Sequence, residues 1–246
     1  MSLADDRERV LHAPNPLGID GIEFVEYTTA KPQALGQVLE MLGFTQVARH
    51  RSREVTLYRQ GGINLIVNAH GATAEEPAIA AVAFRVRDAA SAYHAALARG
   101  AWPVPTQVEV MELNIPAIHG VGASRIYFVD RYREFSIYDV DFVPVLGADS
   151  TAAKPALAKL SLFGVVQYIG PARMADWCAF YSELFGFSLL PTQARFGILP
   201  KGEVLKSPCG QFYWQLIEAD SPDAGGDEHL QRIGLGTPDV LAASEA

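Results

Sequence analysis

An internal repeat is the feature that most constrains the fold of this chain. Residues 21–44 read as a strand, then a helix with apolar residues at 35, 38, 39 and 42, then a Gly-Phe pair. Residues 163–187 repeat this order, and an offset of 143 residues superposes Gly186 on Gly43. Two helices with matched apolar positions at one offset rarely arise by chance. We therefore interpret the two segments as copies of one structural unit.

Each unit is predicted to contain one strand, one helix and three strands. In the first, two strand-like runs meet at Gly61-Gly62, a typical hairpin turn. The second opens at residues 81–86 and continues with a helix that Asp88 caps and Gly100 ends. Extended runs near 106–115, 125–129 and 135–142 complete it. The pattern predicts an α+β fold built from repeated βαβββ modules.

The modules divide the chain into four parts. A third module follows from residue 160, and a fourth opens near residue 230 without the three strands that would complete it in this sequence. We expect an N-terminal segment (1–19), a two-module domain (20–146), a linker (147–158) and a shortened C-terminal domain (159–246).

Charge and composition exclude several classes of partner. The net charge is −8, the isoelectric point is near 5.2, and the longest basic cluster is the short Arg49-His50-Arg51 run. Nucleic acid and anionic membrane surfaces are therefore not expected partners. The sequence contains only two cysteines and no apolar run near the roughly 20 residues of a membrane-spanning helix. These features predict a reduced, cytoplasmic protein.

Five segments of the N-terminal half resemble 4-hydroxyphenylpyruvate dioxygenase: NPLGIDGIEFVEY (15–27), LYRQGGINLIVN (57–68), VAFRVRD (82–88), MELNIPAI (111–118) and IYDVDF (137–142). From 158 to 218 the similarity rests mainly on Arg173-Met174, the helix ending at Phe187 and the SPCG run at 207–210. The resemblance implies a vicinal oxygen chelate fold, in which βαβββ modules pair into open barrels. It also implies a ferrous ion that two His and one Glu hold in the C-terminal pair.

This sequence departs from the iron ligands that the resemblance implies. The first His position falls at Gly164, or at Gln167 if the alignment slips by three residues, and the second falls at Arg232. The Glu position has no counterpart in this sequence. Two polar substrate positions fall at Gly202 and Ile217. In the N-terminal pair, the equivalent ligand positions fall at Gly21, Ala81 and Tyr138. Glycine has no donor atom, and a guanidinium stays protonated and repels a metal ion.

Two readings of the function follow. In the first, the chain is a non-catalytic homologue that needs no cofactor and binds a small aromatic acid, a 2-oxo acid or a protein partner. In the alternative, it is an active Fe(II)-dependent dioxygenase for aromatic 2-oxo acids, as in tyrosine catabolism, with ligands from elsewhere or from a partner subunit. His229 is the one histidine near a lost position, but strand alternation predicts that it points away from Arg232.

Four residues are candidates for holding a ligand. Strand alternation places Tyr213 and Gln215 on the face of Ile217, and Tyr168 on the face of Gly164, while the guanidinium of Arg232 suits a carboxylate. A second interpretation makes Arg232 a solvated side chain and the tyrosines core residues. The incomplete second sheet also leaves an unpaired edge, which favours a homo-oligomer.

Overall fold

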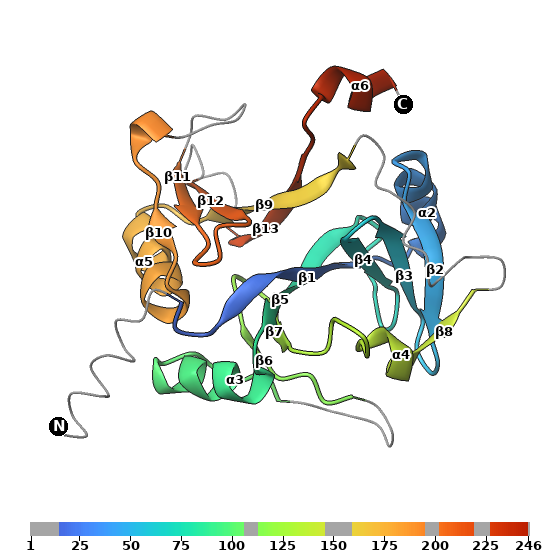
Figure 1. Ribbon diagram of the computed structural model, residues 1–246, viewed down its shortest axis with the longest axis horizontal. Coiled ribbons are helices and arrows are strands. Elements are labelled where there is room, and N and C mark those ends of the chain that lie inside the picture. Colours follow the sequence, from blue (N-terminus) through green and yellow to red (C-terminus); the bar gives the residue numbers. More distant parts are fainter. Residues whose placement is uncertain (1–14, 106–112, 146–158, 195–201, 219–226, 246) are drawn as a thin grey trace.

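The computed structural model contains two open β-sheets that pack against each other (Figure 1). It describes residues 15–105, 113–145, 159–194, 202–218 and 227–245. The larger sheet has eight strands in the order β6-β7-β5-β1-β4-β3-β2-β8, and the smaller has five in the order β10-β11-β12-β9-β13. This confirms the α+β class and the open module pairs. The predicted linker lies outside the described residues.

The elements follow the predicted modules. The first module contains β1 (Ile19–Thr28), α2 (Pro32–Met41), β2 (Thr45–His50), β3 (Val55–Gln60) and β4 (Ile63–Asn68). The second contains β5 (Ala78–Val86), α3 (Ala89–Ala98), β6 (Ala117–His119), β7 (Arg125–Val129), α4 (Tyr138–Asp141) and β8 (Phe142–Pro144). The third contains β9 (Ser161–Ile169), α5 (Met174–Ala179), a π-helical turn (Phe180–Leu184), β10 (Ser188–Leu189), a 3₁₀ turn (Thr192–Ala194), β11 (Glu203–Lys206) and β12 (Tyr213–Glu218). After these come β13 (His229–Gly236) and α6 (Val240–Glu245).

The repeat seen in the sequence is a repeat in the structure. Strand β1 pairs in parallel with β4 and antiparallel with β5, while β9 pairs in parallel with β12 and antiparallel with β13. Gly43 and Gly186 both end their helices with positive φ, at 85° and 78°. The helix signals of the second module are also confirmed, because Asp88 accepts a hydrogen bond from the Ser91 N–H and Gly100 has φ 92°.

Two local predictions are wrong. Residues 138–141 form helix α4 instead of a strand, and Asp139 in its first turn accepts hydrogen bonds from the backbone N–H and the hydroxyl of Ser136. On α2, the predicted apolar stripe is only partly buried: Leu39 is in the core, whereas Val38 and Leu42 are about half exposed.

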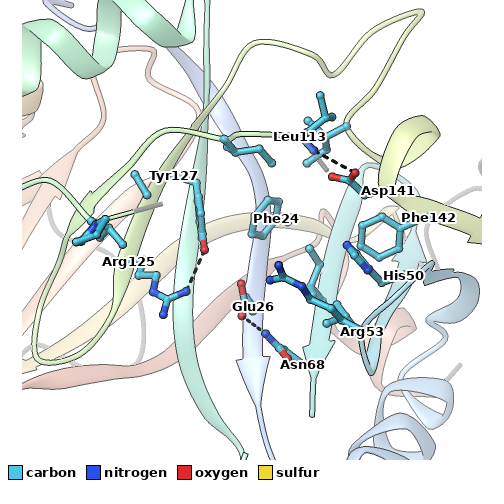
Figure 2. A pocket seen from close by; sticks show the side chains of 17 residues that line it. Phe24, Glu26, His50, Arg53, Asn68, Leu113, Arg125, Tyr127, Asp141 and Phe142 are labelled. Carbon is cyan, nitrogen blue, oxygen red and sulfur yellow. Dashed lines mark hydrogen bonds between the residues drawn. The ribbon is translucent and has the colours of Figure 1, made fainter. Parts of the chain in front are cut away.

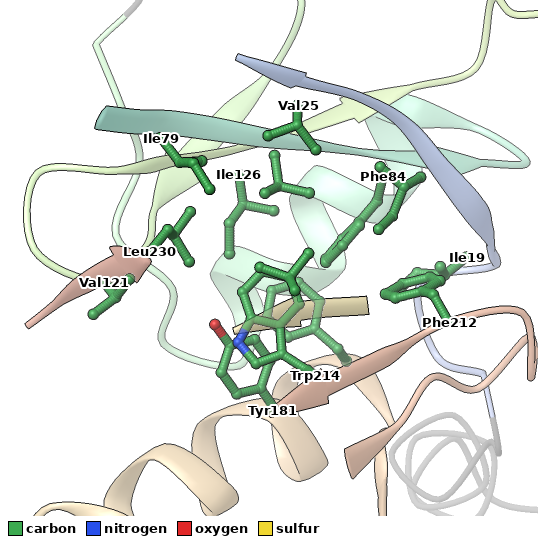
Figure 3. Packing of buried hydrophobic residues seen from close by; sticks show 14 of the residues in the cluster. Ile19, Val25, Ile79, Phe84, Val121, Ile126, Tyr181, Phe212, Trp214 and Leu230 are labelled. Carbon is green, nitrogen blue, oxygen red and sulfur yellow. The ribbon is translucent and has the colours of Figure 1, made fainter. Parts of the chain in front are cut away.

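The two sheets share one hydrophobic core (Figure 3). Phe84 of β5 is fully buried at its centre, and its ring contacts four aromatic rings of the third module, those of Phe185, Phe187, Phe212 and Trp214. The opposite face of the eight-stranded sheet has a core of its own beneath α4. None of the helices in the described residues is long and apolar enough to cross a bilayer.

Candidate functional site

The four ligand candidates of the third and fourth modules lie on one face of the five-stranded sheet. Residues directly opposite each other on paired strands share a face. Gln215 lies opposite Val166, which in turn lies opposite Arg232. Tyr213 lies opposite Gly164, and Tyr168 two residues along the same strand shares this face. The structure therefore brings Tyr168, Tyr213, Gln215 and Arg232 together around Gly164.

His229 lies on this face as well, so the prediction that it points away from Arg232 is wrong. His229 pairs with Tyr168 and Arg232 pairs with Val166, with a register shift between Leu230 and Arg232. The extra residue of this β-bulge resets the alternation, and two residues three apart then share a face. The rings of His229 and Tyr168 are 5.6 Å apart. The two ring nitrogens of His229 contact the Asp227 carbonyl at 2.7 Å and the Gln231 side chain at 2.5 Å.

Gln167 lies on the other face, in the shared core, which excludes it as a replacement ligand. Its side chain is fully buried, and its Oε1 accepts hydrogen bonds from the Tyr181 hydroxyl at 2.7 Å and the Trp214 Nε1–H at 3.0 Å. Gln167 thus links β9 to the π-helical turn that contains Tyr181 and to β12. A slip of three residues in the alignment would place the ligand inside the core.

The residues on the face around Gly164 do not fit an iron site. Gly164 offers no side chain, although a Cβ there would approach Tyr213 O no closer than 3.6 Å. Arg232 is exposed and places a cation on this face. Across the described ranges, no three His, Cys, Asp or Glu side chains lie together as a metal site would require.

The two substrate positions offer no polar side chains either. Gly202 has φ 79°, and a Cβ there would collide with the carbonyl oxygen of Leu216. A serine would therefore not be accommodated in this conformation. Ile217 is buried and apolar. What the face presents is the exposed side chains of Arg232 and His229 beside two partly buried tyrosines and an amide.

A second polar site, which the sequence did not reveal, lies inside the eight-stranded sheet (Figure 2). It is a cavity of about 210 Å³ lined by side chains of β1, β4 and β7 and by the segments around His50 and Leu113. Glu26 in its wall accepts a hydrogen bond from Asn68 Nδ2 at 2.8 Å, and Arg125 donates one to the Tyr127 hydroxyl at 3.3 Å. The one sequence signal was Glu26, one of two glutamates among the apolar residues of β1.

Comparison with known proteins gives consistent matches. The family model described as hydroxyphenylpyruvate dioxygenase, N-terminal, matches residues 13–143. The 4-hydroxyphenylpyruvate dioxygenase of Pseudomonas sp. (strain P.J. 874) is 42% identical over 248 residues, which cover 94% of this chain and 68% of that protein. Hemolysin VllY of Vibrio vulnificus is 38% identical over 251 residues, 94% of this chain and 70% of the relative. A solved fusion of a xylose isomerase-like TIM barrel with 4-hydroxyphenylpyruvate dioxygenase has a TM-score of 0.74 at 26% identity, covering 92% of this chain and 38% of that one.

Proposed function

Because this chain belongs to the hydroxyphenylpyruvate dioxygenase family, we propose that it is a member that binds a small aromatic or 2-oxo acid without performing the iron chemistry of the family. The single observation that carries the proposal is the pair of residues at the implied ligand positions. Gly164 supplies no donor atom, and Arg232 supplies a positive charge on the same face of the sheet.

The same substitutions support a binding role for this face. A guanidinium forms strong, paired hydrogen bonds to a carboxylate. Val166 on the central strand β9 pairs with Arg232 of β13 on one side and with Gln215 of β12 on the other. A carboxylate bound by Arg232 therefore has the Gln215 amide in the same row of paired residues across the sheet. Tyr168 and Tyr213 flank this row and offer ring faces to an aromatic group.

The first test measures iron binding and turnover. Protein prepared without metal is equilibrated anaerobically with Fe(II), and oxygen uptake is then followed with 4-hydroxyphenylpyruvate. We expect less than stoichiometric iron and no substrate-dependent uptake. Titration with phenylpyruvate should detect binding that Arg232→Gln weakens about tenfold or more, because it removes a charged hydrogen-bond donor. Stoichiometric iron with turnover would contradict the proposal and favour the reading in which ligands come from elsewhere or from a partner subunit.

A gain of metal binding would test the assignment of the two positions. Gly164 and Arg232 are diagonal neighbours on β9 and β13, and such pairs are about 7–8 Å apart. Two imidazoles at this separation can share one ion. We expect the double variant Gly164→His with Arg232→His to bind Zn²⁺ at least tenfold more tightly than either single variant, as measured by competition with a chromophoric chelator. Equal affinities in all three proteins would mean that the two positions are not neighbours.

A further inference from the structure

We propose that the cavity inside the eight-stranded sheet is a second, metal-independent binding site, which takes a small aromatic carboxylate. This site does not depend on the function proposed for the face around Gly164, because the two lie on different sheets. It is formed by residues of the first two modules.

The shape of the cavity sets the size of the ligand. Its volume is about 210 Å³. An apolar cavity of about 150 Å³ is large enough for benzene, and sites for drug-sized ligands usually start at about 300 Å³. A single six-membered ring with one small substituent therefore fits.

The walls of the cavity suit an aromatic ring. Phe24 and Tyr127 lie with their rings 5.8 Å apart on one side, and Phe142 and His50 lie 5.3 Å apart on another. Further apolar lining comes from several elements and includes Val55, Ile66, Leu113, Ile115, Ala117 and Ile137.

One end of the cavity is suited to an anion. Arg53 and Arg125 approach Glu26 from opposite sides in Figure 2, beside the Tyr127 hydroxyl. Burial and the charge of Glu26 raise the pKa of Tyr127, while the nearby charges of Arg125 and Arg53 oppose this, so the four groups form one cluster. Both guanidiniums therefore act on the Tyr127 end of the cavity, and Arg125 also acts on Glu26. A guanidinium binds a carboxylate through paired hydrogen bonds.

Two acidic side chains, Glu26 and Asp141, also line the cavity. Burial raises the pKa of Glu26, although its hydrogen bond from Asn68 and the charge of Arg125 oppose the shift, so Glu26 loses its charge more readily than an exposed glutamate. Asp141 lies at the other end of the cavity, where its Oδ1 accepts a hydrogen bond from the Leu113 N–H at 3.2 Å (Figure 2). The ligand is therefore expected to place its carboxylate at the guanidiniums of Arg125 and Arg53 and its ring between Phe24 and Phe142.

Calorimetric titration of the full chain with benzoate tests the proposal, with benzamide as the uncharged compound of the same shape. We expect benzoate to bind at least tenfold more tightly than benzamide. Arg125→Gln and Arg53→Gln should each weaken benzoate binding about tenfold or more, because each removes a charged donor. Ala117→Leu, which adds three carbons to the wall, should weaken both compounds.

Two further variants separate this site from other causes. Arg133→Gln removes an exposed arginine that stacks on Tyr132 outside the cavity, and it should leave benzoate binding unchanged. Arg232→Gln reports on the other face, and the benzoate binding that Arg125→Gln removes should persist in this variant. Absence of benzoate binding, equal binding of benzamide, or a loss seen only with Arg232→Gln would overturn the second site. The last result would leave the function proposed for the Gly164 face intact.

Discussion

Phe84→Ala is expected to destabilise the whole chain by about 3–5 kcal/mol, the usual cost of removing a buried phenylalanine ring. The Phe84 side chain is fully buried, and its ring centre lies 5.5 Å from that of Phe185, 5.6 Å from Phe212 and 6.1 Å from Trp214. Phe84 belongs to β5 of the larger sheet, while its partners belong to the third module. The cavity left by the ring would therefore weaken both sheets at once.

Guanidinium unfolding followed by two signals measures this effect. Far-UV circular dichroism reports both sheets, and tryptophan fluorescence reports mainly the buried Trp214 and Trp177. We expect the two transitions to coincide and to shift together in the variant. Phe135→Ala is the matched control, because Phe135 is 55% exposed and its loss should change the free energy of unfolding by less than about 0.5 kcal/mol. Separate transitions, with only one moved by Phe84→Ala, would contradict a shared core.

Local signals in the sequence were sufficient for the helix ends of the modules. Glycine tolerates the positive φ that ends a helix, so Gly43, Gly100 and Gly186 mark helix ends without knowledge of the rest of the fold. The side chain of Asp88 likewise satisfies a backbone N–H within its own helix turn. These interactions join residues a few positions apart, and for that reason the sequence pattern revealed them.

Features that depend on contacts between distant strands were not predictable in the same way. The bulge at Gln231 exists only in the pairing of β13 with β9, and it moved His229 to the face of Arg232. The inward position of Gln167 depends on Tyr181 and Trp214, 14 and 47 residues away. The cavity around Glu26 needs side chains from several strands of the larger sheet and from the loops between them. Self-association and a protein partner, both expected from the sequence, stay predictions.

Arg85→Met should destabilise the protein by about 3–5 kcal/mol at neutral pH. It removes the hydrogen-bonded counter-charge of a buried carboxylate, and the charge of Arg59, which acts on Glu23 less strongly, remains. Glu23 is 3% exposed, and its Oε2 accepts a hydrogen bond from Arg85 Nε at 2.5 Å. The other oxygen of Glu23 accepts a hydrogen bond from Asn64 Nδ2 at 3.2 Å. The neutral amide of Asn64 cannot supply the positive charge of the Arg85 guanidinium. Methionine is the chosen replacement because it is a long side chain without a charge.

The loss should depend on pH in a defined direction. Burial raises the pKa of Glu23 above its usual 4.5, and the charge and hydrogen bond of Arg85 partly oppose this. A carboxyl group with a raised pKa in the folded state favours folding below its unfolded pKa, and this contribution is lost as the pH rises through the folded pKa. Removal of Arg85 raises that pKa further. The deficit of Arg85→Met in urea unfolding is therefore expected to be smaller at pH 5 than at pH 8.

Glu23→Gln combined with Arg85→Met separates charge from packing. An amide at position 23 carries no charge, so the double variant should be more stable than Arg85→Met alone at pH 8, with a deficit that hardly changes between pH 5 and pH 8. The opposite result would be an equal loss of stability in Arg85→Met at both pH values, with no recovery in the double variant. Arg85 would then stabilise the fold through packing against neighbours such as Tyr132. The Tyr132 ring centre lies 5.6 Å from the guanidinium carbon of Arg85. The neutralisation of Glu23 would then play no part in holding β1 against β5.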